Sequence, residues 1–201
     1  MSGLVPLFYF GGLLAGGMLY PGYSHLTQLP SALGAVGAPH PLVFNASLML
    51  TGVSLFLSAL AFYGAMHALG ARPLWAWSLS VSLAIPAAYF GWVGLITLPD
   101  PRHNAAFPLL LPMHAGPFLL AKGLWHRLDL RPVGWYLSAT GVAMLVLLAI
   151  ALGLGHMVSA RNAGLFIRVY AAAAFVWIGV AGRLLARRLP RDHVGPNATA
   201  T

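Results

Sequence analysis

The chain is dominated by long hydrophobic stretches that are separated by short polar segments. Six such stretches can be placed, at residues 3–20, 41–67, 74–98, 108–124, 133–156 and 163–184. Each is close to the roughly 20 residues that an α-helix needs to cross the hydrocarbon core of a bilayer. The segments between them contain proline, glycine, asparagine, aspartate and arginine, which commonly end helices. The pattern predicts an all-α, polytopic integral membrane protein built as a six-helix bundle.

The basic residues predict how this bundle is oriented. Six spans place the second loop, the fourth loop and the C-terminal tail on one side, and these regions contain Arg72, Lys122, Arg127, Arg131, Arg183, Arg187, Arg188 and Arg191. Only Arg102 and Arg161 lie in loops on the other side. Because cytoplasmic loops are enriched in Lys and Arg, an N-in/C-in topology follows. Residues 1–184 then form one transmembrane domain, and residues 185–201 form a basic, disordered cytoplasmic tail.

Composition supports the membrane class and excludes several others. Hydrophobic residues make up 59% of the chain, charged residues make up 7%, and the mean hydropathy is +0.80. Soluble domains carry about 25% charged residues. The net charge of +8 comes from scattered single residues, so a nucleic-acid-binding face is not indicated. The absence of cysteine excludes disulfides and thiolate metal sites. The first stretch has neither a basic flank nor a cleavage site, so we interpret it as a retained span.

Small residues and prolines within the spans predict how the helices pack. Gly12 and Gly16 form a small-xxx-small pair, and residues 171–174 are all alanine. Such faces allow close helix contact, either within the chain, in a homo-oligomer or with a membrane-protein partner. Prolines that should kink the third and fourth spans are Pro86, Pro112 and Pro117.

Polar residues gather on the predicted outer side. The first outer loop is residues 21–40 and the second is residues 99–107. Five of the eight histidines lie on this side, namely His25, His40, His103, His114 and His156. Asp100, Arg102 and Asn104 lie in the second loop, and Asn45 is at the top of the second span. These residues predict a polar pocket at the outer leaflet.

Arg168 lies inside a hydrophobic stretch, about a turn and a half from the outer surface. An arginine at the centre of a span costs on the order of 3 kcal/mol, so such a residue is usually paired or functional. Asp100 is the only acidic residue expected on this side. The sequence therefore predicts an ion pair of Asp100 with either Arg168 or Arg102. The alternative is that Arg168 extends its head to the interface.

Three interpretations of the histidines remain open. His25, His103, His114 and Asp100 are suitable zinc ligands, although no HExxH motif is present. A second interpretation is that the histidines ligate haem in pairs. His114 and His126 share one span, and His40 and His67 lie at the ends of another. In the third, each histidine is an interfacial residue or a hydrogen-bond partner.

The same residues suggest catalytic and ligand-binding roles. We expect Asp100, His103 and His25 to be catalytic if the protein is an enzyme, with His as general base or a metal-activated water. Serine nucleophiles could come from Ser24, Ser31 and Ser47. Guanidinium groups match phosphate oxygens, so a lipid phosphate would contact Arg102, Arg161 and Arg168, assisted by Asn45 and Asn104.

Several short motifs resemble a known family. They are Tyr23-Ser24-His25, 31–35 (SALGA), Ala38-Pro39, Phe44-Asn45, Thr51-Gly52, the stretch 91–99, and Asp100 followed by 103–106 (HNAA). Together they resemble a bacterial six-span family, domain of unknown function nine-nine-eight. The layout is also distantly similar to the Frag1/DRAM/Sfk1 group of six-span proteins. The resemblance implies a bacterial inner (cytoplasmic) membrane location and, by analogy with that group, a lipid-related role.

The sequence thus supports three hypotheses of function. The first is a pocket at the outer leaflet that engages a lipid headgroup or another amphiphile, as a binding protein or as a metal-assisted lipid hydrolase or acyltransferase. The second is a non-catalytic membrane scaffold or regulator. The third is a bis-histidine haem protein that transfers electrons.

Overall fold

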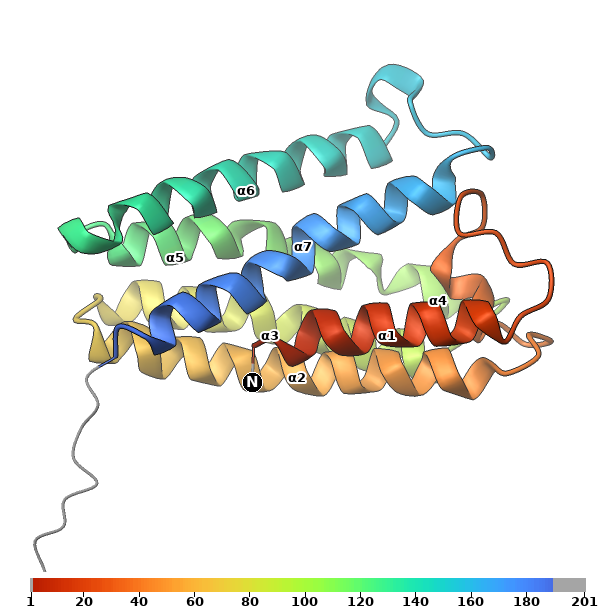
Figure 1. Cartoon of the computed structure of the whole chain (residues 1–201), viewed down its shortest axis with the longest axis horizontal. Helices are drawn as coiled ribbons and strands as arrows, with labels where there is room; N and C mark the ends of the chain where they lie inside the picture. Colours follow the sequence, from red (N-terminus) through yellow and green to blue (C-terminus); the bar gives the residue numbers. More distant parts are fainter. Residues whose placement is uncertain (1, 190–201) are drawn as a thin grey trace, which may run out of the picture.

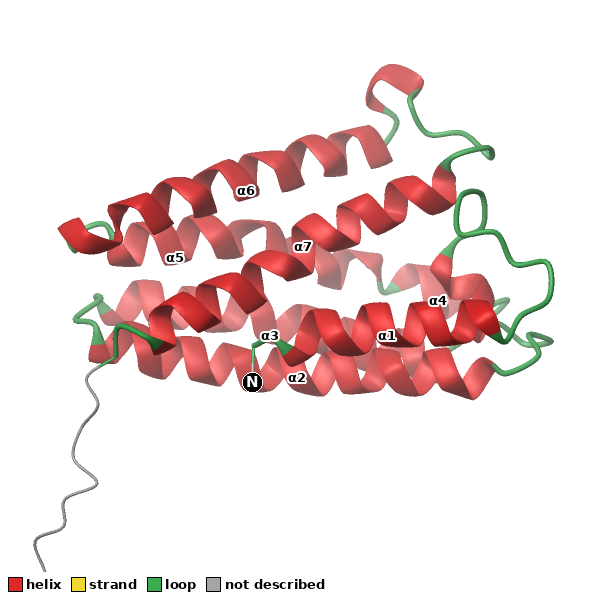
Figure 2. Cartoon of the chain, viewed as in Figure 1, coloured by secondary structure: helices red, strands yellow, loops and turns green. Residues whose placement is uncertain are grey.

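A computed structural model describes residues 2–189, and every regular element in this range is a helix (Figures 1 and 2). The elements are α1 (Leu4–Met18), η1 (Pro30–Gly34), α2 (Pro41–Ala68), α3 (Pro73–Leu95), α4 (Pro101–Ala105), η2 (Phe107–Ala115), α5 (Gly116–Leu124), η3 (Leu128–Leu130), α6 (Arg131–Ala151), η4 (Leu154–His156) and α7 (Ala163–Ala186). The long helices run roughly along one axis and form a bundle (Figure 1). The all-α prediction is confirmed for the described part of the chain.

Five helical segments are long and apolar enough to cross a bilayer: Pro41–Ala68, Pro73–Leu95, Pro101–Leu124, Leu128–Ala151 and Ala163–Ala186. The remaining long helix, α1, has only 15 residues. At a rise of 1.5 Å per residue it is about 22 Å long, shorter than the roughly 30 Å hydrocarbon core. The fold is therefore that of a multi-pass membrane protein, and the sixth span remains a prediction.

The start of α1 lies alongside α7 rather than at the end of the bundle (Figure 1). A Cβ atom on Gly179 would lie 3.6 Å from the Cα atom of Gly3, which fixes the contact between the two helices. Glycine allows this approach because it removes the side chain from the contact. The sequence pattern alone did not reveal that α1 is shorter than the five helical segments long enough to cross a bilayer.

Two predicted spans differ in detail from the observed helices. The stretch at 133–156 ends as an α-helix at Ala151, because Gly153 adopts a φ of 107° that glycine favours. The stretch at 108–124 begins as the 3-10 segment η2, which contains Pro112. Proline lacks the N–H that a continuous α-helix needs. Pro86, in contrast, lies inside α3 without ending it.

Close packing between helices depends on small residues, as the sequence predicted. A Cβ atom on Gly12 would clash with the side chain of Ser47, and a Cβ on Gly52 would lie 2.7 Å from the carbonyl oxygen of Ala87. These contacts bring α1 against α2 and α2 against α3. Gly12 and Gly16 are buried within the chain. Their small-residue face is therefore used inside the bundle, and a partner on such a face stays a prediction.

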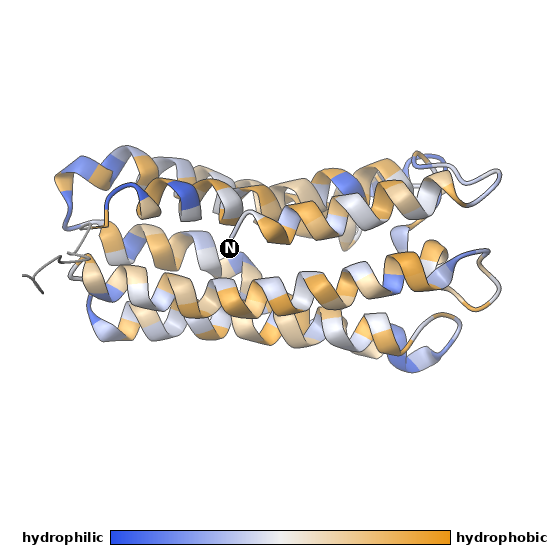
Figure 3. Ribbon diagram, turned by 60° about the horizontal axis from the view of Figure 1, so that its bottom comes forward, coloured by the Kyte–Doolittle hydropathy of each residue, from blue (hydrophilic) through white to orange (hydrophobic). Residues whose placement is uncertain are grey.

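The surface of the bundle is suited to lipid. Large hydrophobic side chains are exposed along the helices, among them Leu7, Leu42, Leu74, Trp135 and Leu145. Figure 3 shows hydrophobic residues over the middle of the bundle, while hydrophilic residues lie mostly toward its two ends. At one end, Asp129 pairs with Arg127 and Arg188 at 3.1 Å each. These pairs tie the loop before α6 to the end of α7. Residues 190–201 of the predicted cytoplasmic tail lie outside the described residues, whereas Ala186 still belongs to α7.

Candidate functional site: an aromatic cavity between the helices

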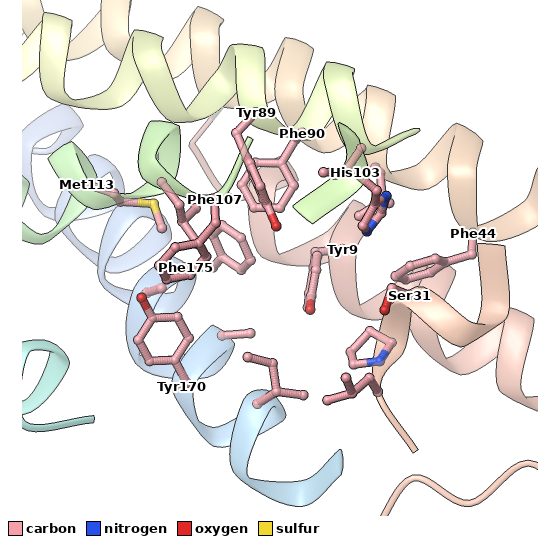
Figure 4. Close-up of a pocket in the computed structure, with 18 of the residues that line it drawn as sticks. Tyr9, Ser31, Phe44, Tyr89, Phe90, His103, Phe107, Met113, Tyr170 and Phe175 are labelled. Atoms are coloured by element: carbon pink, nitrogen blue, oxygen red, sulfur yellow. The ribbon is translucent and has the colours of Figure 1, made fainter. Parts of the chain in front are cut away.

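A cavity of about 280 Å³ lies between α1, α2, α3, η2 and α7, near the end of the bundle that contains η1 and α4 (Figure 4). Residues from η1 and α4 line its mouth. The complete lining is Tyr9, Leu29, Pro30, Ser31, Phe44, Leu48, Tyr89, Phe90, Val93, His103, Asn104, Phe107, Leu110, Met113, Ile167, Tyr170, Ala171, Ala174 and Phe175. None of these residues is Asp, Glu, Lys or Arg, so the cavity is largely apolar and aromatic.

The floor of the cavity is an aromatic cluster centred on Tyr9. Its ring meets Phe44 and Phe90 edge to face, with centroids 6.4 and 6.2 Å away, and lies 4.9 Å from the ring of Phe175. Such arrangements are favoured by the quadrupoles of the rings. The cluster joins α1, α2, α3 and α7, so four separate helices fix its geometry.

Two tyrosine hydroxyls point into this apolar space without a protein partner. Tyr9 is only 6% exposed, and Figure 4 shows its hydroxyl and that of Tyr89 directed into the cavity. Neither hydroxyl has a hydrogen-bond partner among residues 2–189. Both hydroxyls reach the open space of the cavity, so water or a bound molecule can serve as their partner.

His103 supplies a third polar group at the mouth of the cavity. Its side chain is buried, and its Nδ1 lies 2.6 Å from the carbonyl oxygen of Ile96. A carbonyl oxygen only accepts hydrogen bonds, so Nδ1 carries the proton and donates. In the neutral form of the ring Nε2 is then the acceptor, and no residue in the described range binds it. The sequence predicted His103 as a site residue, and it does line the cavity.

His114 is held in a hydrogen-bonded chain beside the cavity. Its Nδ1 donates to the carbonyl oxygen of Leu111 at 2.8 Å, so Nε2 accepts from the hydroxyl of Tyr170 at 2.6 Å. Both ring nitrogens are thus used by the protein. His114 does not line the cavity itself, but it orients Tyr170, which does.

Arg168 forms a separate polar cluster with the loop that follows α1. Its guanidinium donates to the carbonyl oxygens of Gln28 (3.0 Å) and Gly164 (2.6 Å), to the hydroxyl oxygen of Tyr23 (2.6 Å) and to Nδ1 of His25 (3.2 Å). The guanidinium carbon also lies 5.7 Å from the centroid of the Tyr23 ring. We call these five residues the Arg168 cluster. A guanidinium group can donate to several acceptors at once because its N–H donors are fixed in one plane.

The Arg168 cluster attaches the loop that follows α1 to α7. The N–H of Leu165 donates to the carbonyl oxygen of Leu26 at 2.9 Å, and Gly164 leaves room for the loop backbone. Burial and the positive charge of Arg168 both lower the pKa of His25. A neutral His25 can accept the hydrogen bond from Arg168, whereas a protonated ring cannot. The loop residues of the cluster directly precede Leu29, Pro30 and Ser31 in the chain, and these three residues line the cavity.

Asp100 pairs with Arg102 and not with Arg168, which decides between the two predicted ion pairs. The distance from Arg102 Nη2 to the Asp100 carboxylate is 2.6 Å. The carboxylate also accepts from the backbone N–H of Arg102 at 2.9 Å and so caps α4. Hydrogen bonds from Arg102 hold the pKa of this carboxyl at about 2. Asp100 is therefore an engaged anion at neutral pH.

The remaining predicted ligand-binding residues are dispersed. The amide of Asn45 donates to the carbonyl oxygen of Gly34 at 3.0 Å and holds η1 on α2. Arg161 is exposed in the loop before α7. Asn104 lines the mouth of the cavity. Of the predicted site residues, Ser31, His103 and Asn104 line the cavity, and the others do not.

The proposed metal ligands do not converge. Across residues 2–189, no three His, Cys, Asp or Glu side chains lie close enough together to hold a metal ion. His25, His103 and His114 each bind a different protein partner. Nor does any hydrogen bond in that range join Ser24, Ser31 or Ser47 to a histidine.

The residues of the suggested haem site have other neighbours. His126 Nε2 donates to the carbonyl oxygen of Leu69 at 3.2 Å. His40 precedes α2 and His67 is in its last turn, so these two lie at opposite ends of one helix. The haem hypothesis itself stays a prediction.

Sequence reasoning missed the tyrosines of the cavity. Tyr9, Tyr89 and Tyr170 lie within hydrophobic stretches, where tyrosine was counted as an apolar residue. A hydroxyl deep in a predicted span is a polar group that needs a partner. That signal was present in the sequence, but it does not say which tyrosines face one another.

Helices of this length and apolarity, with hydrophobic side chains exposed along the bundle, define a multi-pass α-helical membrane protein. The family model described as "Protein of unknown function (DUF998)" matches residues 4–184, and the chain belongs to this family. Comparisons with curated proteins and with solved structures gave no match. The family resemblance stated from the sequence motifs is thus confirmed, whereas the similarity to the Frag1/DRAM/Sfk1 group stays a prediction.

Proposed function

We propose that this protein binds a membrane amphiphile in the cavity of its outer half. The observation that carries the proposal is an apolar, aromatic cavity of about 280 Å³ with unpartnered hydroxyls of Tyr9 and Tyr89 inside it. Ligand sites typically combine apolar walls with a few placed polar groups. Exposed hydrophobic side chains outside the cavity, such as Leu7 and Leu42, are suited to contact with lipid. A molecule dissolved in the membrane would therefore lie next to the protein and could enter the cavity.

The polar end of the ligand would contact tyrosine and histidine rather than arginine. Arg102 and Arg168 have their guanidinium groups engaged by Asp100 and by the first outer loop, respectively. His103 and Asn104 line the mouth together with Ser31. This assignment replaces the phosphate-binding set expected from the sequence with neutral hydrogen-bonding groups.

Retention of a lipid by cavity-filling variants tests the proposal. Ala171 lines the cavity and is 5% exposed, so Ala171→Phe or the smaller Ala171→Leu would fill the space. Val169 is on the same helix but is 49% exposed, and Val169→Phe is the matched control. Each protein is extracted with its lipids in polymer nanodiscs, and the co-purified lipids are quantified per chain by mass spectrometry.

We expect wild type and Val169→Phe to retain the same lipid and the Ala171 variants to lose it. Equal retention by the Ala171 variants, or no enriched lipid in any sample, would overturn the proposal. Thermal unfolding of each variant identifies a misfolded protein, and Ala171→Leu keeps the test decisive if Ala171→Phe does not fold.

We further propose that the chain crosses the cytoplasmic membrane six times, with α1 as a short first span and both termini inside. Support comes from the basic residues near one end, where Arg127 and Arg188 share Asp129. The chain has no cysteine, so single-cysteine variants can be labelled without background. A membrane-impermeant maleimide should label Thr27→Cys in intact cells and label Arg72→Cys only after lysis. The reverse pattern would overturn this topology.

A further inference from the structure

The chemistry of the lining narrows the class of ligand, and this inference rests on the proposed function. We propose that the cavity takes a flat, uncharged ring with oxygen atoms at its edge, as in the head of a membrane quinone. Charge, shape and hydrogen bonding each support this class of ligand.

Charge excludes the common phospholipid heads from the inner part of the cavity. The lining contains no Asp, Glu, Lys or Arg. Transferring an ionised group into apolar surroundings is very costly unless an opposite charge compensates it. A phosphate or an ammonium head would find no such partner here. An uncharged head enters without this penalty.

Shape favours a planar head. Tyr9, Phe44, Phe90 and Phe175 form one contiguous aromatic cluster, and Phe107 and Tyr170 add further rings to the lining. Aromatic rings prefer offset-stacked or edge-to-face neighbours, which a flat ligand ring can supply. A volume of about 280 Å³ is at the small end for ligand sites, so it suits one compact ring better than two acyl chains.

Hydrogen bonding explains why the ring should carry oxygen. The hydroxyls of Tyr9 and Tyr89 are available as donors, and a quinone carbonyl oxygen can only accept. The Nδ1 of His103 donates to Ile96, so a neutral His103 presents Nε2 as an acceptor at the mouth. A ring hydroxyl, as in the reduced quinol, could donate to that nitrogen. The same cavity therefore accommodates both forms of the ring.

Three probes separate this ligand class from other lipids. We would titrate the purified protein in nanodiscs with decylubiquinone, dioleoylglycerol and dioleoylphosphatidylglycerol and measure binding by native mass spectrometry. Decylubiquinone carries the uncharged ring, dioleoylglycerol is uncharged without a ring, and dioleoylphosphatidylglycerol is anionic. We expect decylubiquinone to bind most tightly and to lose its binding in Ala171→Phe.

Removal of single hydroxyls tests the hydrogen bonds. Tyr9→Phe and Tyr89→Phe should each weaken decylubiquinone binding about tenfold, because each loses one donor to the ring oxygen. Tyr63→Phe is the matched control, since Tyr63 packs on Trp77 and does not line the cavity. It should bind decylubiquinone like wild type. The two cavity variants act independently, so one remains informative if the other fails to fold.

The outcomes distinguish this inference from the proposed function. Tighter binding of dioleoylglycerol or dioleoylphosphatidylglycerol, lost in Ala171→Phe, would overturn the ring and leave the lipid-binding cavity intact. Unchanged decylubiquinone binding in both Tyr9→Phe and Tyr89→Phe would overturn the hydrogen-bonding assignment. Binding of all three probes that is insensitive to Ala171→Phe would overturn the cavity as the lipid site.

Discussion

Two polar groupings at the same end of the bundle differ in whether their hydrogen-bonding groups have partners within the protein. In the Arg168 cluster, Nε, Nη1 and Nη2 of the guanidinium all donate to protein acceptors. In the cavity, the hydroxyls of Tyr9 and Tyr89 have no partner among the described residues. The first grouping is complete within the protein, whereas the second leaves hydroxyls that a molecule in the cavity could contact.

Polar groups that serve the fold differ from groups that face a ligand in having protein partners. Most buried polar groups in proteins are hydrogen-bonded, so each exception calls for an explanation. From sequence, Arg168 looked like the more informative residue because its charge is costly in a membrane. The structure shows that its donors are met by Tyr23, His25, Gln28 and Gly164, whereas the hydroxyls of two uncharged tyrosines face the open cavity without a protein partner.

The largest expected effect is on stability, from breaking the Arg168 cluster. Arg168→Met leaves Tyr23, His25 and Gln28 without their donor and should lower the free energy of unfolding by about 3 kcal/mol, because hydrogen bonds to charged groups are the stronger ones. Arg161→Met is the control, since Arg161 is exposed and its side chain makes no hydrogen bond in the described range. Chemical unfolding in detergent measures both. If Tyr9→Phe lowered the free energy of unfolding by a comparable amount, the Tyr9 hydroxyl would be as important for stability as Arg168, which would contradict this comparison.

A smaller effect on stability is expected from adding a side chain at Gly164, where the loop after α1 packs on α7. A Cβ atom on Gly164 would lie 2.6 Å from the carbonyl oxygen of Gln28 and 2.8 Å from that of His25. Gly164→Ala should therefore destabilise the protein by about 1–3 kcal/mol through overpacking. Gly91→Ala meets open space and should be neutral or stabilising by up to about 1 kcal/mol. Thermal unfolding compares them, and equal melting temperatures would mean that the loop does not depend on this contact.

A pH dependence should follow from His25. Its pKa is lowered in the folded protein, so the unfolded chain binds the proton more readily. The contribution of His25 to stability is complete above the unfolded value, about 6.5, and declines as pH falls toward the folded pKa. The melting temperature should drop between pH 7.5 and about 5. In His25→Gln, an amide oxygen can still accept from Arg168 without titrating, and the drop should shrink. An identical pH profile in this variant would assign the dependence to other groups.

The smallest effect is expected at Asp100, although the sequence suggested it as catalytic. Its pKa of about 2 lies below the ordinary value, so its stabilising ion pair is present above about pH 4 and is lost only as pH falls through about 2. Between pH 5 and 8 it should not titrate. Asp100→Asn should change decylubiquinone binding less than twofold, because Asp100 does not line the cavity. A tenfold loss on titration of the variant would place Asp100 in the ligand site.

The pattern of hydrophobic residues was sufficient to assign the class of protein and much of its helix layout. Hydrophobic stretches near 20 residues long must satisfy their backbone groups internally in lipid, and the α-helix does so from local bonds alone. The stretches at 41–67, 74–98 and 163–184 accordingly match α2, α3 and α7 closely. The motifs around Tyr23 and Asn45 were sufficient to indicate the family.

Only the tertiary structure decided the length of α1 and which polar residues are satisfied by the protein. Arg168 and Tyr23 are 145 positions apart in the chain, yet they form one hydrogen bond. The cavity combines residues from Tyr9 to Phe175. Whether a polar group is paired or left open depends on distances between helices that lie far apart in sequence. Hydrophobic periodicity reports only the local backbone and its surroundings, so it could not reveal the unpartnered hydroxyls on which the proposed function rests.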